Sequence, residues 1–376
     1  MPRTLPPLLY ADTHSSADML YFGRVEVHDP FLAFGHGRRR ITVQSPLEFG
    51  RVRRTSIFNA VLRLDEWRER ARRKYGPRAG MPEIIATVVR AHGLRAFRIA
   101  DDFPAALYLR LKRLGLHLHL ANGALFPERE IKTEPELAQI REGNRLATLG
   151  FSVVERILAA SRRKGRTLVH RGKVVTSESL RFQVESAIRE QGGDAKDTIV
   201  AGGDQACDPH ERGTGPLRPD QLVIVDIFPR VLKSGYFGDM TRTYLKGRAS
   251  DAQRRLCATV LAAQRAAIRM IRARVDGRDV HELVIHVFTE AGYATTHSAK
   301  GSEGFIHGTG HGLGLAIHEA PRLSTVKYLL RKGSVVTVEP GLYYPGLGGC
   351  RWEDVVQVTS MAPRLLSRHP YDWEIR

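Results

Sequence analysis

Cysteine is scarce in this sequence, and long hydrophobic runs are absent. The 376 residues include three cysteines, Cys207, Cys257 and Cys350, and their odd number and wide separation argue against a disulfide framework. No run of about 18 apolar residues occurs, which excludes a membrane-spanning helix. The N-terminal stretch carries early prolines and no apolar core of about 7–15 residues, so it does not predict a signal peptide. We therefore expect a cytoplasmic protein with reduced thiols.

Positive charge exceeds negative charge by a wide margin. The sequence has 58 lysine and arginine residues against 40 aspartate and glutamate residues, a net charge of +18. Such a chain is attracted to nucleic acid or to acidic surfaces. Most of the excess is arginine spread along the whole chain, however, and genome-wide base composition produces the same bias. We therefore do not expect a nucleic-acid partner.

The composition is that of a globular protein with more than one domain. Hydrophobic residues make up 42% and charged residues 26% of the chain, close to the average for soluble proteins. At about 100–200 residues per domain, the length predicts two domains or three. A polar segment at residues 126–135 contains two prolines and a cluster of charges, which is typical of a boundary. We therefore expect an N-terminal domain of residues 1–130 and a second domain of residues 131–376.

The N-terminal domain mixes two kinds of segment. Short apolar runs at residues 19–22, 84–89, 97–100 and 116–120 alternate with arginine-rich, helix-like stretches around residues 64–74 and 105–114. This mixture predicts a small α/β domain.

The second domain repeats one pattern twice. Each repeat begins with two segments of helical spacing and continues with strand-like runs. The first has helices at 136–164 and 177–191 and strands at 198–200, 222–227 and 241–245, and the second has helices at 250–274 and 280–291 and strands at 334–338 and 354–359. The pattern predicts an α+β domain of two related halves whose strands join into one curved, mainly antiparallel sheet.

Acidic residues interrupt two apolar strands of this domain. Asp226 follows Leu-Val-Ile-Val, and Glu339 follows Val-Val-Thr-Val in the second half. A single acid in a strand is usually an edge residue or a salt-bridge partner, but an ionised carboxylate inside an apolar strand is costly unless it is paired or binds a metal. Asp239 lies thirteen residues after Asp226. A strand, a turn and a returning strand would bring these two carboxylates side by side.

A fourth acid, Glu353, lies at the start of a predicted strand. Arg351, Glu353 and Val355 share one face of that strand because side chains alternate between its faces. We therefore expect Arg351 to neutralise and orient the Glu353 carboxylate through its two-pronged guanidinium.

Three histidines, His307, His311 and His318, lie within a glycine-rich segment. The spacing of the first two is that of a zinc-binding pair on a helix, but glycines at positions 308, 310, 312 and 314 make a helix unfavourable. We expect an extended segment whose backbone passes close to something bulky such as a substrate. On such a segment His307 and His311 point the same way.

Four carboxylates and at least one imidazole form a ligand set for divalent metals. Oxygen-rich ligation with one imidazole suits Mn²⁺, Fe²⁺, Co²⁺ or Zn²⁺, and four carboxylates are enough to bridge two ions. Two ions about 3.5–4 Å apart hold a hydroxide between them and stabilise a tetrahedral intermediate. These residues therefore point to hydrolytic chemistry.

At these residues the sequence resembles the pita-bread metallopeptidases, which include aminopeptidase P, prolidase and, more distantly, methionine aminopeptidase. The resemblance covers about residues 131–362, and the first domain is loosely similar to the non-catalytic, creatinase-like N-terminal domain of the first two. It rests on five motifs in matching order: Val225-Asp226, Gly238-Asp239-Met-Thr-Arg-Thr, His307-Gly-Thr-Gly-His311, Val338-Glu339-Pro-Gly-Leu and Arg351-Trp-Glu353-Asp.

The resemblance implies a dinuclear metal centre in a pita-bread catalytic domain with pseudo-two-fold halves. Its ligands would be Asp226, Asp239, His311, Glu339 and Glu353, with Asp239 and Glu353 bridging two divalent ions. Mn²⁺ is the first expectation, and Co²⁺, Zn²⁺ and Fe²⁺ are the others.

The resemblance also implies catalytic roles. Glu339 would act as general base on the bridging water, and His318 would donate a hydrogen bond to the oxygen of the tetrahedral intermediate. His307 and His210 would lie in the substrate cleft, and Arg351 would lie beside the bridging glutamate.

The activity implied is that of a metal-dependent exopeptidase that cleaves the Xaa-Pro bond of dipeptides or short peptides. The family usually separates its two aspartates by about eleven residues, whereas here the connection is longer and includes Pro229 and Arg230. That departure keeps open a second hypothesis, a dinuclear-metal hydrolase of a small non-peptide C–N compound on the same fold. A third hypothesis is a non-enzymatic binding module with a basic surface, although such proteins usually lose metal ligands.

Family members with this domain pair commonly form homodimers, which we expect here.

Overall fold

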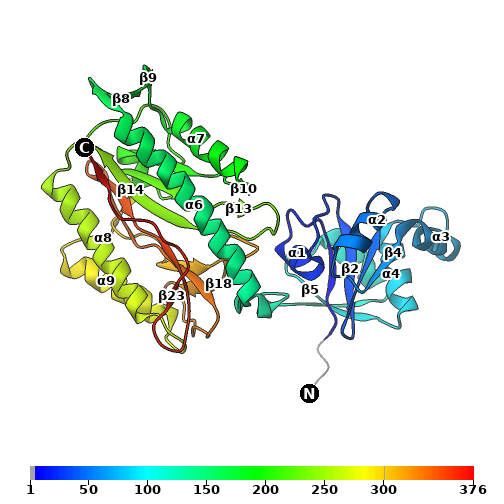
Figure 1. The fold of residues 1–376 in the computed structure, drawn as a ribbon. Coiled ribbons are helices and arrows are strands. Elements are labelled where there is room, and N and C mark those ends of the chain that lie inside the picture. The colour runs from blue at the N-terminus through cyan, green and yellow to red at the C-terminus, as the bar shows by residue number, and fades with distance from the viewer. Residues whose placement is uncertain (1–4, 300) are drawn as a thin grey trace. The chain divides into compact units, whose positions relative to one another are not determined.

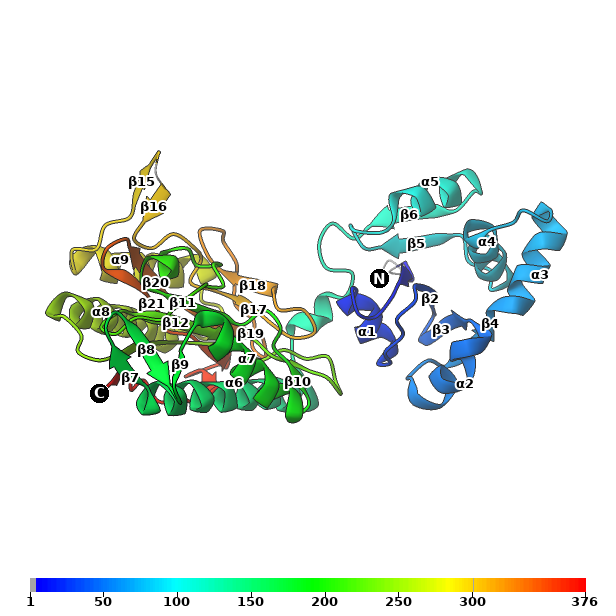
Figure 2. The same cartoon turned by 90° about the horizontal axis from the view of Figure 1, so that it is seen from above.

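The computed structural model describes residues 5–299 and 301–376 of the chain. It divides into two compact units, Met1–Arg129 and Glu130–Arg376. Each unit has its own helices and strands (Figures 1 and 2) and its own hydrophobic core.

The first unit combines a four-stranded sheet, a separate parallel strand pair and five helices among its described residues. The sheet has the order β1 (Leu8–Ala11), β2 (Phe31–His36), β3 (Arg39–Gln44) and β4 (Ala60–Arg63), and the pair is β5 (Ala96–Ile99) and β6 (His117–Leu120). The helices are α1 (Ala17–Gly23), α2 (Pro46–Thr55), α3 (Leu64–Tyr75), α4 (Met81–Ala91) and α5 (Ala105–Arg113).

Two of the four apolar runs of this unit are helical. Residues 19–22 lie within α1 and residues 84–89 within α4, whereas the other two runs coincide with β5 and β6. Five of the six residues at 84–89 are buried in α4, so the run is almost continuously apolar over its short length. A short apolar run does not by itself distinguish a strand from a buried helix.

The second unit repeats a helix pair followed by strands, as its sequence predicts. Its first half contains α6 (Glu134–Ala160), β7 (Arg162–Lys164), β8 (Thr167–His170), β9 (Lys173–Val174), α7 (Ser177–Glu190), β10 (Gly193–Asp194), β11 (Ile199–Gly202), β12 (Val223–Ile227), β13 (Arg230–Val231) and β14 (Met240–Lys246). Helix α6 begins at a capping box in which the backbone N–H of Thr133 donates to Glu136 Oε2 over 2.9 Å.

The second half follows the same order. It contains α8 (Asp251–Met270), α9 (Gly277–Glu290), β15 (Thr296–Ser298), β16 (Gly301–Glu303), β17 (Gly310–Gly312), β18 (Glu319–Leu323), β19 (Val335–Val338), β20 (Gly341–Tyr344), β21 (Gly348–Arg351), β22 (Asp354–Gln357), β23 (Arg364–Leu365) and β24 (Glu374–Ile375). The glycine-rich histidine segment is extended at β17, as its glycines predict.

The strands of the two halves form two main sheets and not the single sheet that we expected. One sheet has the order β11-β12-β14-β24 and the other β18-β17-β19-β22-β23. They approach each other at β14 and the start of β22, where the backbone N–H of Glu353 donates to Thr241 O over 3.1 Å. Strand β21 ends at Arg351 and β22 begins at Asp354. The two residues between them belong to no strand, so backbone pairing is not continuous from one sheet to the other.

Each helix pair covers one sheet with apolar side chains. Leu146 of α6 and Val184 of α7 share a buried cluster with Val225 of β12. Val260 of α8 shares another cluster with Val338 of β19. Figure 1 shows the helices flanking the strands, so the residues that end β12 and β19 are held by buried packing.

The first residues of the second unit are anchored to its second half. The Glu130 carboxylate, which is 7% exposed, accepts hydrogen bonds from Ser334 Oγ and the Tyr328 hydroxyl, both over 2.8 Å. Lys132 forms a buried ion pair with Glu319 over 3.1 Å. Residues 130–132 are therefore part of the packed unit.

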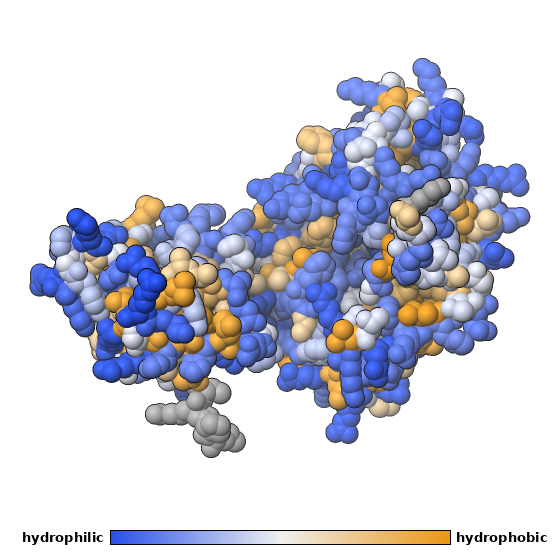
Figure 3. All heavy atoms as spheres, turned by 180° about the vertical axis from the view of Figure 1, so that it is seen from behind, coloured by the Kyte–Doolittle hydropathy of each residue, from blue (hydrophilic) through white to orange (hydrophobic). Residues whose placement is uncertain are grey.

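Hydrophilic residues predominate on the face of the molecule that Figure 3 presents, and hydrophobic residues are scattered among them. A search of the described residues finds no helix that combines the length and the hydrophobicity needed to span a membrane.

Two glycines of α6 lie at close packing contacts of different kinds. A Cβ atom on Gly143 would lie 2.3 Å from the backbone nitrogen of Gly238, next to Asp239. A Cβ atom on Gly150 would meet side-chain tips instead, the nearest being Ile227 Cδ1 at 2.7 Å. Backbone cannot move aside as a side chain can, so only the first glycine fixes the distance between α6 and the Asp239 turn.

We predict that Gly143→Ala destabilises the protein by about 3 kcal/mol or more, because the added methyl group overlaps backbone atoms. Gly150→Ala is the matched control on the same helix. Both changes raise helix propensity by about 1 kcal/mol, but Gly150→Ala displaces only flexible side chains, so its cost is smaller. Urea denaturation of the two variants measures the difference, and equal free energies of unfolding would contradict the prediction.

Candidate metal centre

Five acidic and histidine side chains from both halves of the second unit approach one another. Asp226 lies in β12 and Asp239 directly precedes β14, the strand that pairs with β12. His311 lies in β17, Glu339 directly follows β19, and Glu353 lies between β21 and β22. Antiparallel pairing of β12 with β14 brings the first two together, and adjacent pairing of β17 with β19 does the same for the next two.

The donor atoms are close enough to share an ion. One ligand atom each from Asp239, His311 and Glu353 lies within 4.8 Å of the other two. His311 Nε2 lies 3.3 Å from Glu339 Oε1 and 3.7 Å from Asp239 Oδ2. Asp239, His311 and Glu353 are buried, at 4%, 6% and 1% exposure.

Two carboxylate oxygens of this group are buried without a hydrogen-bond partner, Asp226 Oδ1 and Glu353 Oε1. The second oxygen of each is satisfied, by Arg351 Nη2 over 2.8 Å and by the Thr241 hydroxyl over 2.8 Å respectively. A buried carboxylate oxygen without a partner is costly. A cation bound at these oxygens removes that cost, so the residues present fit a divalent metal site.

The pKa values of the carboxyl groups reflect crowded negative charge. Burial, followed by repulsion from the neighbouring carboxylates, raises the pKa of Asp239 and of Glu353 well above their ordinary values. Burial also raises the pKa of Asp226, against the attraction of Arg351. Three carboxyl groups that resist ionisation in one place are typical of a site that is completed by a cation.

His311 and Glu339 form a hydrogen-bonded pair in the absence of metal. Burial would lower the pKa of His311, but the hydrogen bond and charge of Glu339 raise it to about 9. Burial would raise the pKa of Glu339, but the bond and charge of His311 lower it to about 2. Metal ligation requires neutral imidazole, so a metal ion would replace a proton on His311.

Arg351 pairs with a different carboxylate from the one that its sequence position suggested. Its Nη2 lies 2.8 Å from Asp226 Oδ2, and its other hydrogen bonds go to Thr241 Oγ1, the Tyr343 hydroxyl and Pro209 O. We expected a direct pair with Glu353 because the two residues share a strand face. The chain changes direction between β21 and β22, so the long side chain reaches across to β12. Arg351 affects Glu353 through its charge and through the Thr241 hydroxyl, which contacts both residues.

The glycines of the histidine segment allow close approach of neighbouring strands. A Cβ atom at Gly310 would lie 2.0 Å from Thr337 O, and one at Gly312 would lie 2.1 Å from Ala320 O. We expected a substrate to require this room, and the structure corrects that expectation at these two positions. The strands on either side, β18 and β19, need the space because they pair with β17 at short range.

The remaining histidines lie around the same carboxylates. The His318 ring stands edge-on to the His311 ring with 4.4 Å between centroids, and His307 Nε2 lies 2.7 Å from the Tyr343 hydroxyl. Burial lowers the pKa of both His307 and His318 to about 4, so both are neutral at pH 7. His210 is exposed.

Three further residues hold this group in place and were missed at the level of sequence. Tyr343 connects His307 to Arg351 through its hydroxyl. Thr241 donates to Glu353 Oε2, and Asn144 of α6 accepts the backbone N–H of Asp239 over 2.9 Å. Thr241 lies within a motif that the sequence displays, but nothing in the sequence connects Asn144 to Asp239, 95 positions away.

The long connection between Asp226 and Asp239 reaches the glycine-rich loop. It contains β13, which pairs with β10, and the backbone N–H of Phe237 donates to Gly314 O over 2.8 Å. The end of this connection, directly before Gly238 and Asp239, therefore contacts the loop that leads to His318.

The fold and this group of residues define a metallopeptidase domain. The chain belongs to metallopeptidase family M24, whose family model matches residues 138–360. It is 31% identical to the Bacillus subtilis protein YkvY over 302 residues, 77% of this chain and 76% of that one. It is 33% identical over 190 residues to the Xaa-Pro dipeptidase of Pyrococcus furiosus, a match that spans about half of each chain, 50% and 52%.

Solved structures share the architecture along almost the whole chain. The Xaa-Pro dipeptidase from Bacillus anthracis superposes with a TM-score of 0.80 at 25% identity, covering 99% of this chain and 95% of that one. The X-Pro aminopeptidase from Thermotoga maritima also gives 0.80, at 19% identity, with coverage of 99% and 98%. The pita-bread fold expected from the sequence is confirmed.

We predict that Asp239→Asn stabilises the metal-free protein. The change removes one of several crowded, buried carboxylates and keeps the side-chain shape, so the free energy of unfolding rises by about 1 kcal/mol and Tm by about 2–4 °C. Adding Mn²⁺ should raise the Tm of the wild type and leave that of the variant nearly unchanged. A variant less stable than the metal-free wild type would contradict the prediction.

The advantage of Asp239→Asn should grow with pH. The folded-state pKa of Asp239 lies above its ordinary value of 3.8, so its contribution to stability is present below about pH 4 and is lost as pH rises through the raised pKa. Thermal unfolding of both metal-free proteins from pH 5 to pH 8 measures the difference. A constant difference in Tm would show that Asp239 has an ordinary pKa.

Proposed function

We propose that this protein is a metal-dependent exopeptidase that hydrolyses the Xaa-Pro bond of dipeptides or short peptides. The observation that carries the proposal is the convergence of five metal-binding side chains, two of which have buried oxygens without a hydrogen-bond partner. The names of the relatives, an Xaa-Pro dipeptidase and an X-Pro aminopeptidase, support the substrate class.

The proposed centre holds two divalent ions. Asp226, Asp239, His311, Glu339 and Glu353 would hold the ions, and Asp239 and Glu353 would be shared between them. Mn²⁺ is the first choice among Mn²⁺, Co²⁺, Zn²⁺ and Fe²⁺ because oxygen ligands predominate. When bound, such ions lower the pKa of water and supply a nucleophile at neutral pH.

The chain itself supplies the proton transfers and the orientation of substrate. Glu339 accepts the proton of the attacking water and passes it to the leaving amine. His318 is a neutral donor at pH 7 and stabilises the oxygen of the tetrahedral intermediate. His307 and His210 line the substrate cleft, and Arg351 orients Asp226 through a hydrogen bond and favours its ionised form against the effect of burial.

The wider organisation of the protein is also a proposal. Residues 1–130 form a non-catalytic, creatinase-like domain, and residues 131–376 form the catalytic domain. We propose a cytoplasmic homodimer, as is common among proteins with this domain pair.

A second candidate function is supported by one observation. The long connection between Asp226 and Asp239 contacts the loop before His318 through the bond from Phe237 N to Gly314 O. A loop of altered shape beside the substrate would suit a small non-peptide compound with a C–N bond, hydrolysed by the same centre.

Cleavage of the Xaa-Pro bond tests the main proposal, measured as release of proline from dipeptides and of the N-terminal residue from a tripeptide. Metal-stripped protein is supplied with Mn²⁺, Co²⁺ or Zn²⁺ and given Ala-Pro, Met-Pro or Gly-Pro-Ala. We expect metal-restored cleavage of the Xaa-Pro bond and no cleavage of Pro-Ala, in which the order of residues is reversed. Release of proline from the dipeptides alone identifies a dipeptidase, and release of glycine from Gly-Pro-Ala identifies an aminopeptidase.

The variants Asp239→Asn and Glu353→Gln provide the matched test of the centre. Each keeps the size of the side chain and removes a bridging charge, so both should lose metal binding and lower kcat/KM by about 1000-fold or more. Full activity in either variant would overturn the proposal. Binding of two ions per chain without cleavage of any proline peptide would favour the second candidate.

A further inference from the structure

A C-terminal segment, residues 366–371, runs between α6 and the strands that carry the metal-binding residues. Figure 1 shows the last part of the chain passing beside α6 toward β14. Two side chains of α6 hold its carbonyl groups: Asn144 Nδ2 donates to Leu366 O and Thr148 Oγ1 donates to Arg368 O, both over 3.1 Å. The segment leads to β24, which pairs with β14.

Asn144 connects this segment to one of the bridging carboxylates. The same amide that donates to Leu366 O accepts the backbone N–H of Asp239 through Oδ1 over 2.9 Å. Asn144 is 2% exposed and both ends of its amide are used. A shift of the segment is therefore passed to the backbone of Asp239 through one rigid side chain.

Arg242 connects the segment to the other bridging carboxylate. Its guanidinium, 1% exposed, donates to Pro370 O over 3.1 Å and to His369 O over 2.9 Å. Its Nη1 donates to Glu353 O over 2.7 Å and to Thr241 O over 2.9 Å. Thr241 is the residue whose hydroxyl holds Glu353 Oε2.

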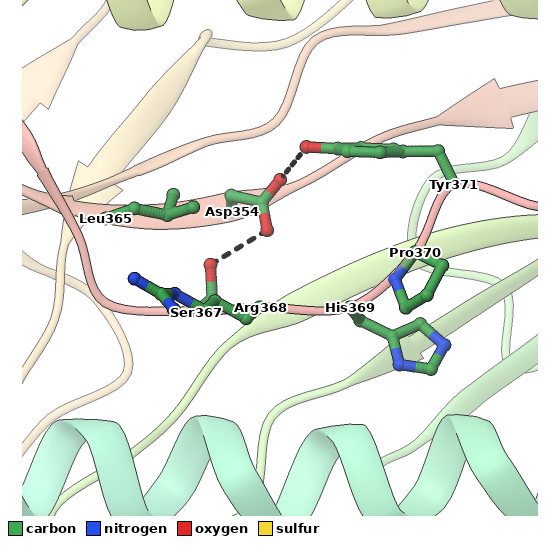
Figure 4. Close-up of a pocket in the computed structure, with 7 residues that line it drawn as sticks. All are labelled: Asp354, Leu365, Ser367, Arg368, His369, Pro370 and Tyr371. Atoms are coloured by element: carbon green, nitrogen blue, oxygen red, sulfur yellow. Dashed lines mark hydrogen bonds between the residues drawn. The ribbon is translucent and has the colours of Figure 1, made fainter.

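Asp354 completes the connection from the residue next to Glu353. Its Oδ1 accepts from Arg242 and from Ser367 Oγ over 2.8 Å, and its Oδ2 accepts from the Tyr371 hydroxyl over 2.5 Å and from Gln264 over 2.9 Å. Figure 4 shows Ser367 and Tyr371 reaching Asp354 from opposite ends of the segment. A fully satisfied buried network of this kind is rigid.

We propose that the C-terminal segment, residues 366–371, is a brace that positions both bridging carboxylates, Asp239 through Asn144 and Glu353 through Arg242 and Asp354. Asn144, Arg242 and Asp354 are positioning residues, because they touch the backbone of the ligands and not the ions. Partners outside the ligand shell fix ligand orientation, and their loss typically weakens metal affinity about 10–100-fold. The proposal rests on the metal centre proposed above and is independent of its substrate.

Asn144→Leu tests the brace against a matched control, Thr148→Val, one turn further along α6. Each variant removes one hydrogen bond from α6 to the segment, but only Asn144→Leu also frees the Asp239 backbone. The readouts are the dissociation constant for Co²⁺ from its visible absorption, Tm of the metal-free protein, and kcat and KM for whichever substrate is turned over. We expect Asn144→Leu to weaken Co²⁺ binding about tenfold or more and Thr148→Val to change it less than twofold.

A second variant covers the case in which Asn144→Leu does not fold. Tyr371→Phe removes the hydroxyl that donates to Asp354 Oδ2 and should weaken Co²⁺ binding about threefold. Tyr328→Phe is the control, because its hydroxyl donates to Glu130 and not to the segment, and it should leave Co²⁺ binding unchanged. Affinity equal to wild type in both Asn144→Leu and Tyr371→Phe would overturn the brace. Equal losses of Co²⁺ affinity and of Tm in the test and control variants would also overturn the brace, because they would indicate a general loss of packing. A wild type that binds no Co²⁺ would overturn this proposal together with the metal centre.

Discussion

The concentration of negative charge in the second unit is the constraint on which the rest of the structure depends. Asp226, Asp239, Glu339 and Glu353 lie together with one guanidinium, that of Arg351, and one imidazole. Asp226, Glu353 and Glu339 have partners in Arg351, Thr241 and His311, but one oxygen of Asp226 and one of Glu353 stay without a hydrogen bond. Such a group stays together only if the surrounding backbone cannot yield, because repulsion and desolvation both favour opening it. Rigidity is therefore a requirement of this site.

The architecture provides that rigidity from both halves. Each helix pair packs against one sheet through buried apolar side chains. The candidate ligands lie in or directly beside β12, β14, β17, β19 and β22, where these sheets approach each other. Polar connections then secure the individual carboxylates, as Thr241 does for Glu353 and Asn144 for Asp239. The contacts that stabilise the domain therefore also position the carboxylates of the site.

Much of this could be predicted from the sequence, because its signals are local. Helical spacing located α6 to α9, strand-like runs located β12, β14, β19 and β22, and motif order singled out the five candidate ligands. The direction in which a side chain points in the folded protein could not be predicted. Arg351 reaches Asp226 because the chain turns after β21, and Gly310 faces Thr337 because β17 and β19 pair closely. The partnership of Asn144 and Asp239 joins distant parts of the chain and has no sequence signature.

The anchoring of residues 130–132 bears on how the two units became associated during evolution. Glu130 and Lys132 precede α6 and look like linker in the sequence, yet both are buried against the second half, and Lys132 pairs with Glu319 directly after His318. An exchange of N-terminal units between related proteins would have to join the chains upstream of Glu130. A junction a few residues later would remove Lys132 and leave Glu319, the residue after His318, without this ion pair. Recombination within this family is therefore expected to favour crossover points before residue 130.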